Sequence, residues 1–169
     1  MDVSNLRTLS EWLAHSTLSL QLQEAMWVIP MIQTVHILAV AVAIAAAFLL
    51  DLRVLGAFAI GEPSDRIAKR LLPWARWAIA VLAMSGALLI VAEPERCLTN
   101  AAFWSKMLML IMALSTTGIL HKGIRRTCAF WEISPPRRVT GKIIAGTSLL
   151  LWSGVVLAGR WIAYLGVPK

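Results

Sequence analysis

The sequence predicts an all-α membrane protein, a four-helix transmembrane bundle with a short N-terminal amphipathic helix in the membrane interface. Three observations carry this prediction. Hydrophobic residues make up 59% of the 169 residues, and the mean hydropathy of +0.73 exceeds that of ordinary soluble domains. Four apolar runs are long enough to cross a bilayer core of about 30 Å. Most charged residues lie between these runs.

The four spans are predicted over residues 26–50, 72–92, 101–120 and 142–165. Together they make residues 1–169 a single integral membrane domain. Pro73 suits the first turn of the second span, and Pro135 and Pro136 separate the third span from the fourth. The interfacial helix is predicted from apolar residues at helical spacing, which are Leu6, Leu9, Trp12 and Leu13.

The distribution of charge predicts the orientation of the bundle. Four spans place both termini and residues 93–100 on one side, and residues 51–71 and 121–141 on the other. With the span ends included, the first side has five basic and five acidic residues, whereas the second has a balance of 11 − 4 = +7, the whole net charge. The positive-inside rule therefore puts the basic side in the cytoplasm. Because the basic residues flank apolar runs, nucleic acid is not an expected partner.

A polar site is predicted in the outer half of the bundle. His36 and Lys106 each lie 15 residues, roughly 22 Å of helix, from the cytoplasmic ends of their spans, and Arg160 lies roughly 27 Å up the fourth. We expect these three side chains to converge, with Gln33 and Tyr164 nearby, because ionisable residues inside a membrane usually serve a function. In the alternative reading, Lys106 and Arg160 extend to lipid headgroups and His36 only bonds to a neighbouring helix.

His36 makes a haem b or a quinone the expected cofactor. A haem with two histidine ligands within this chain is not expected, because His36 and His121 differ in height by on the order of 20 Å. His36 is therefore a metal ligand only if it binds a haem iron whose second ligand is a methionine or comes from a partner chain. A quinone headgroup is the other candidate, because His36 and Lys106 can polarise its carbonyl groups.

A second polar cluster, Asp51, Arg53 and His121, is expected at the inner end. Asp51 and Arg53 are two residues apart and point in different directions on a helix. We expect this cluster to be structural, fixing the ends of the first and third spans. Cys97 and Cys128 fall on opposite sides of the predicted membrane, which excludes a disulfide between them.

Three segments carry a resemblance to a known family. They are VHILAVAVAIAAAFLLDLRVLG from residue 35, LTNAAFWSKMLMLIMA from residue 98 and LLLWSGVVLAGRWIAYLG from residue 149. The chain resembles an uncharacterised family of small four-span bacterial inner-membrane proteins with the pattern H…DLRxLG…K…GRWIAY. The resemblance implies the fold, the bacterial inner membrane and the motif positions, and it implies no activity.

Three classes of function remain open. The first is a membrane subunit of a redox or electron-transfer assembly that binds haem or quinone near His36. The second is a cofactor-free anchor or assembly subunit, and the third is a small-molecule carrier, which the lack of an inverted repeat disfavours. An independent enzyme is not expected, since the sequence shows no catalytic constellation. The expected partners are the lipid bilayer and other membrane or periplasmic subunits or further copies of the chain.

Overall fold

The computed structural model describes residues 3–59, 61–62, 64–126, 131 and 134–165, and in this part of the chain its regular secondary structure is all helical. Its helices are α1 (Val3–Ala14), α2 (Thr17–Glu24), α3 (Val28–Leu55), α4 (Ser64–Ala92), α5 (Pro94–Leu98), α6 (Ala101–Arg126) and α7 (Pro135–Leu165). The four long helices α3, α4, α6 and α7 are long and apolar enough to cross a membrane. The predicted four-span bundle with a short N-terminal helix is confirmed, and the chain is a multi-pass membrane protein.

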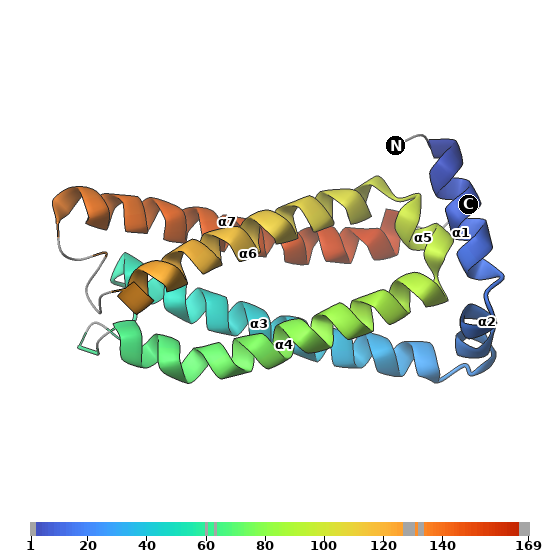
Figure 1. Ribbon diagram of the computed structural model, residues 1–169, viewed down its shortest axis with the longest axis horizontal. Coiled ribbons are helices and arrows are strands. Elements are labelled where there is room, and N and C mark those ends of the chain that lie inside the picture. Colours follow the sequence, from blue (N-terminus) through green and yellow to red (C-terminus); the bar gives the residue numbers. More distant parts are fainter. Residues whose placement is uncertain (1–2, 60, 63, 127–130, 132–133, 166–169) are drawn as a thin grey trace.

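The bundle is built from two antiparallel helix pairs. α3 packs along α4, α6 packs along α7, and α3 also contacts α7 (Figure 1). The short helices α1, α2 and α5 lie together at one end, which we call the capped end (Figure 1). The α3–α4 and α6–α7 connections lie at the opposite end, which we call the basic end because the +7 charge balance falls there.

Two long helices begin earlier than the sequence predicts. α4 starts at Ser64, so Pro73 lies inside the helix and not in its first turn. α7 starts at Pro135, because a proline at the first helical position has no backbone N–H to leave unpaired. In both cases a polar helical segment extends the apolar span, and hydropathy alone does not detect that extension.

Small side chains fill the contacts between the long helices. Ala47 of α3 and Ala113 of α6 are buried against Trp152 of α7. Alanines let the helix backbones approach closely, which is how helices associate in lipid. Large apolar side chains are exposed along all four helices, among them Ile37, Met84, Ile111 and Leu150, and they form the surface expected to contact lipid.

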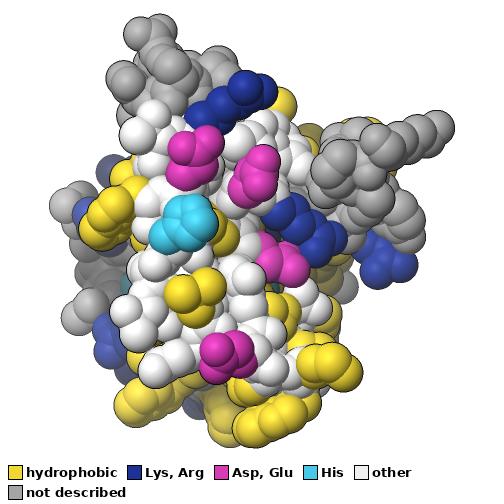
Figure 2. Space-filling model, turned by 90° about the vertical axis from the view of Figure 1, so that its right-hand side faces the viewer, with side chains coloured by type: hydrophobic (Ala, Val, Ile, Leu, Met, Phe, Trp, Pro, Cys, Tyr) yellow, Lys and Arg dark blue, Asp and Glu magenta, His cyan; other side chains and the backbone are white. Residues whose placement is uncertain are grey.

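The capped end is tied to the bundle by polar contacts. Gln23 of α2 donates from Nε2 to the carbonyl oxygen of Ala92, at 2.9 Å, where α4 ends and backbone acceptors lack helical partners. α1 packs against α5 and leaves Leu9 and Trp12 exposed, the latter at 71%. Acidic, basic and hydrophobic side chains are interspersed on this face (Figure 2). This mixture fits a helix layer lying in a membrane interface.

The basic end is closed by a loop tryptophan. Trp131 donates from Nε1 to the carbonyl oxygen of Leu120, at 3.2 Å. A methyl group at Gly123 would lie 2.6 Å from three atoms of its indole ring, and one at Gly141 would lie 3.1 Å from it. The ring is therefore seated against α6 and α7 at these two glycines, and a side chain at Gly123 would require the ring to shift.

Candidate functional site

His36 is fixed by a side chain of the neighbouring helix. Its Nδ1 lies 2.8 Å from Oγ of Ser85 on α4, and the Ser85 hydroxyl donates to the carbonyl oxygen of Val81, at 2.6 Å. A methyl group at Gly86 would lie 3.5 Å from Cε1 of His36. At Ser85 and Gly86, α4 therefore contacts α3 through the imidazole ring of His36.

The hydrogen-bond chain is the basis for assigning the proton of His36 to one ring nitrogen. Ser85 has a single hydroxyl proton, and the Val81 carbonyl oxygen can only accept. We assign the serine proton to the Val81 carbonyl oxygen, and with this assignment Nδ1 of His36 is the donor to Oγ of Ser85. This assignment leaves Nε2 of the neutral ring with a lone pair. Within the described part of the chain, the hydrogen bond of the His36 ring is the one that Nδ1 makes with Ser85.

Lys106 reaches the same part of the bundle from α6. Its Nζ lies 3.6 Å from the position of a methyl group at Gly159, so the side chain runs across the α7 backbone where no side chain blocks it. The ammonium group is close enough to His36 for their charges to interact. The convergence of His36, Lys106 and Arg160 stays a prediction, and Gly159 is the small residue beside which the Lys106 side chain runs.

The short helix α5 adds further charge above this site. Arg96 and Glu93 form an ion pair with 3.0 Å between Nη1 and Oε2. Cys97 is half-buried, and burial raises the pKa of its thiol. The Glu93 carboxylate raises this pKa further, while Arg96 and Lys106 act in the opposite direction. The group of polar residues therefore extends from His36 to the capped end.

Two other residues predicted for the outer site, Gln33 and Arg160, have exposed side chains. Gln33 is exposed on α3. Arg160 follows Gly159 on α7, but its side chain is exposed. The side chain of Tyr164 lies outside the residues whose side chains are described. His36, Ser85 and Lys106 consequently form the candidate site, which we call the His36 site.

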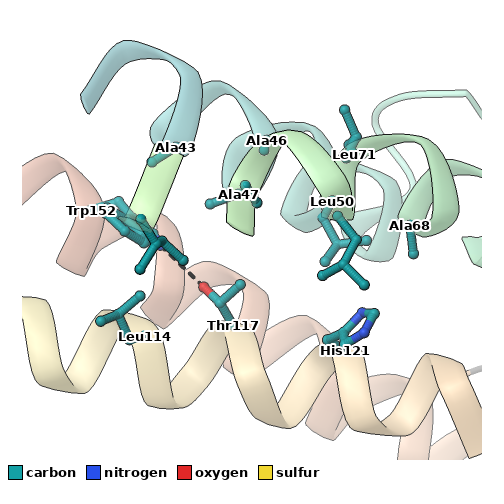
Figure 3. A pocket seen from close by; sticks show the side chains of 13 residues that line it. Ala43, Ala46, Ala47, Leu50, Ala68, Leu71, Leu114, Thr117, His121 and Trp152 are labelled. Atoms are coloured by element: carbon teal, nitrogen blue, oxygen red, sulfur yellow. Dashed lines mark hydrogen bonds between the residues drawn. The ribbon is translucent and has the colours of Figure 1, made fainter. Parts of the chain in front are cut away.

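The three residues of the predicted second cluster, Asp51, Arg53 and His121, lie in different surroundings. Arg53 donates from Nε and Nη2 to the carbonyl oxygen of Glu62 at 2.9 and 2.7 Å, which fixes the α3–α4 connection. His121 lines a cavity of about 60 Å³ between α3, α4 and α6, which Trp152 of α7 also lines (Figure 3). Asp51 is fully buried on α3, and neither of its carboxyl oxygens has a hydrogen-bond partner among the described residues.

The sequence-based site prediction does not include three hydrogen-bonding residues of α6 and α7, which are Thr117, Ser148 and Trp152. Trp152 donates from Nε1 to Oγ1 of Thr117, at 3.1 Å, the contact drawn in Figure 3. Oγ1 of Thr117 lies 3.4 Å from Oγ of Ser148. Serine and threonine are common in membrane helices, so their residue types carry little signal. Only the rotation of α6 and α7 about their axes shows that they face each other.

Fold and site together define a small four-span membrane protein in which the side chain of His36 is held by a hydrogen bond from the neighbouring helix. The chain matches the model of the family of unknown function DUF6644 over residues 11–165 and belongs to that family. The predicted membership of an uncharacterised family of small four-span proteins is thereby confirmed. No curated protein and no solved structure matches the chain.

Proposed function

We propose that this protein is a membrane subunit of a redox assembly and that the His36 site binds the headgroup of a quinol or quinone. The observation that carries the proposal is the orientation of the imidazole. Nδ1 of His36 donates to Ser85, which leaves the lone pair of Nε2 available to a ligand inside a membrane span. Ionisable groups at such a depth are costly and usually functional.

The two ends of a quinol ring need partners of different kinds. With Nδ1 protonated, Nε2 of His36 accepts a hydrogen bond from one hydroxyl group of the quinol. Lys106 carries only donors, and its ammonium group can bind the oxygen at the other side of the ring. The glycines at 86 and 159 keep the backbones of α4 and α7 accessible beside these two groups. The site therefore offers one acceptor and one donor to a flat ligand.

A haem b is the second candidate ligand, and the hydrogen bond between His36 and Ser85 favours it as well. Histidines that ligate metals usually donate their other ring N–H to a fixed partner, as His36 does to Ser85. The iron would bind Nε2. His121 lies at the basic end with Leu50 and Ala68, so a second axial ligand would come from elsewhere in this chain or from a partner.

The proposed setting is a bacterial inner membrane with the capped end outside. The positive-inside rule places the +7 balance of the basic end in the cytoplasm. The assembly would join further membrane or periplasmic subunits, and small residues on the helix faces favour close packing against them. In this arrangement the chain supplies a binding site and is not an enzyme by itself.

The test is to purify the protein in mild detergent from the membranes in which it is made. Its absorption spectrum and its extractable quinone are then measured together. We expect about one quinone per chain in the wild type, a loss in His36→Ala and retention in the matched variant His121→Ala. A haem spectrum that depends on His36 would support the second candidate. A wild type with neither group would refute the proposal and favour a cofactor-free anchor.

A further inference from the structure

A stripe of basic and aromatic side chains runs along the first half of α4. Four exposed residues form this surface, which we call the α4 stripe: Arg66, Arg70, Trp74 and Trp77. The exposed fractions of the two tryptophans are 68% and 73%. Because a helix turns about 100° per residue, Arg66, Arg70 and Trp77 lie within about 40° of one another, and Trp74 lies about 40° beyond Arg70. Met84, which is 70% exposed, continues the same face into the apolar span.

The length of α4 places the two arginines among the lipid headgroups. α4 has 29 residues, which at 1.5 Å per residue is roughly 43 Å of helix. The hydrocarbon core is about 30 Å thick, so the polar start of α4, residues 64–72 at the basic end, extends beyond it (Figure 1). Trp74 and Trp77 follow at the edge of the apolar span, the level where indole rings are enriched in membrane proteins.

The polar groups of the α4 stripe are not used within the described part of the chain. There, neither Arg66 nor Arg70 has an ion-pair partner, and neither indole N–H of the stripe donates a hydrogen bond. The acidic residue beside them, Asp65, pairs with Lys69, with 2.8 Å between Oδ2 and Nζ. Two guanidinium groups and two indole N–H groups are therefore available to a ligand outside the chain.

We propose that the α4 stripe binds one anionic phospholipid that carries two phosphate groups, the chemistry of cardiolipin. A guanidinium group binds phosphate oxygens through two parallel hydrogen bonds. Side chains one helical turn apart lie about 5–6 Å from each other, so Arg66 and Arg70 can each take one phosphate of the same lipid. The indole N–H groups can donate to the ester oxygens below, and Met84 extends the apolar surface for the acyl chains.

Charge favours a lipid over a second copy of the chain as the occupant of the α4 stripe. In a symmetric dimer, both copies would place their arginines at the same level of the membrane, and the like charges would repel. Phosphate groups at that level neutralise them. The stripe lies at the basic end, apart from the His36 site, and the proposal does not rest on the proposed function.

The basic end offers a matched control on another helix. Arg138 and Lys142 of α7 are exposed and also lie one helical turn apart. Residues 143–149, the next two turns of α7, contain no tryptophan. This pair therefore carries the same charge as Arg66 and Arg70 but lacks the neighbouring indole donors.

Native mass spectrometry of the detergent-solubilised protein, titrated with cardiolipin, tests the site. We expect the wild type to bind one cardiolipin per chain, more tightly than phosphatidylglycerol, which has one phosphate. The double variant Arg66→Gln, Arg70→Gln should bind cardiolipin about 25-fold more weakly, from about fivefold for each arginine. Trp74→Phe with Trp77→Phe keeps two aromatic rings without their N–H groups and should also weaken binding. Arg138→Gln with Lys142→Gln should leave binding nearly unchanged.

Three results would overturn the proposal. Equal losses in the arginine variant and in the α7 control would show only a general attraction to the basic end. Equal binding of cardiolipin and phosphatidylcholine would show that the phosphates are not recognised. A lipid-free dimer that the arginine variant separates into monomers would assign the α4 stripe to a second copy of the chain. The tryptophan variant gives the same binding readout if the arginine variant does not fold, and full affinity in it would also count against the site.

Discussion

Replacing Ser85 with alanine tests whether α4 holds His36 in place. The variant removes the acceptor that lies 2.8 Å from Nδ1 of His36 and leaves this N–H unpaired. An unsatisfied buried group costs about 1–3 kcal/mol in soluble proteins, whereas side-chain hydrogen bonds between membrane helices average about 0.6 kcal/mol with a maximum near 1.7. Because His36 is half-buried, we expect a loss of about 1 kcal/mol, or about fivefold in the folded-to-unfolded ratio.

The assay is unfolding in mixed detergent micelles with increasing dodecyl sulfate, followed by circular dichroism. Ser115→Ala is the matched control, since Ser115 is exposed on α6 and donates to the carbonyl oxygen of Ile111 in its own helix. We expect its free energy of unfolding to stay within about 0.5 kcal/mol of the wild type. A double-mutant cycle of Ser85→Ala and His36→Ala isolates the bond. A coupling energy near zero would show that the bond does not hold the ring.

Two further variants and one pair of thiols test other parts of the account. Gly123→Ala should lower the free energy of unfolding by about 1–3 kcal/mol, since the added methyl group meets the indole ring of Trp131 at 2.6 Å; the dodecyl sulfate titration measures it. Alkylation of Cys97 should be slow at neutral pH and speed up as the pH rises, because its thiol pKa is raised and only the thiolate reacts. Glu93→Gln should speed the neutral reaction several-fold, as measured by mass spectrometry. In intact cells, alkaline labelling should reach Cys97 before Cys128.

Each of these expectations has a control and a contrary result. Gly146→Ala adds a methyl group with no atom within 4 Å, and it should raise the free energy of unfolding by about 0.5–1 kcal/mol. Equal effects of the two glycine variants would contradict the seating of the tryptophan ring. A rate for Cys97 that does not change in Glu93→Gln would show that the carboxylate leaves the thiol unaffected. Labelling of Cys128 first would reverse the proposed orientation.

The four membrane-spanning helices could be predicted from hydropathy, but the residues at which the helices begin and end could not. Apolar runs specify which segments cross the membrane, because each run must match the bilayer thickness. The polar first turns of α4, from Ser64, and of α7, from Pro135, carry charges that hydropathy assigns to loops. The short helix α5 is also absent from the prediction. Its five residues pack against α1, and that contact is formed only in the folded chain.

The sequence could predict the level of the site residues along the bundle, but only partly the helix face on which each residue lies. Helical rise places His36 and Lys106 at one level, and the structure brings them into the same region. Rise does not specify how far each helix turns about its axis or how far the neighbouring helices cover it. Gln33, one turn before His36, proves to be exposed. The same uncertainty hides the contact of Thr117 with Ser148. Residues on one helix share a face by spacing alone, but contacts between helices depend on packing.

Nitrogen NMR of the histidine rings tests the central claim most directly. The chain has three histidines, so ring-labelled protein in lipid gives few signals, and His36→Gln assigns one of them. We predict that His36 is protonated at Nδ1 and that its Nε2 signal shifts when a short-chain quinol is added, while the signals of His15 and His121 stay unchanged. A ring protonated at Nε2, or a quinol that shifts His121 and leaves His36 unchanged, would contradict the account.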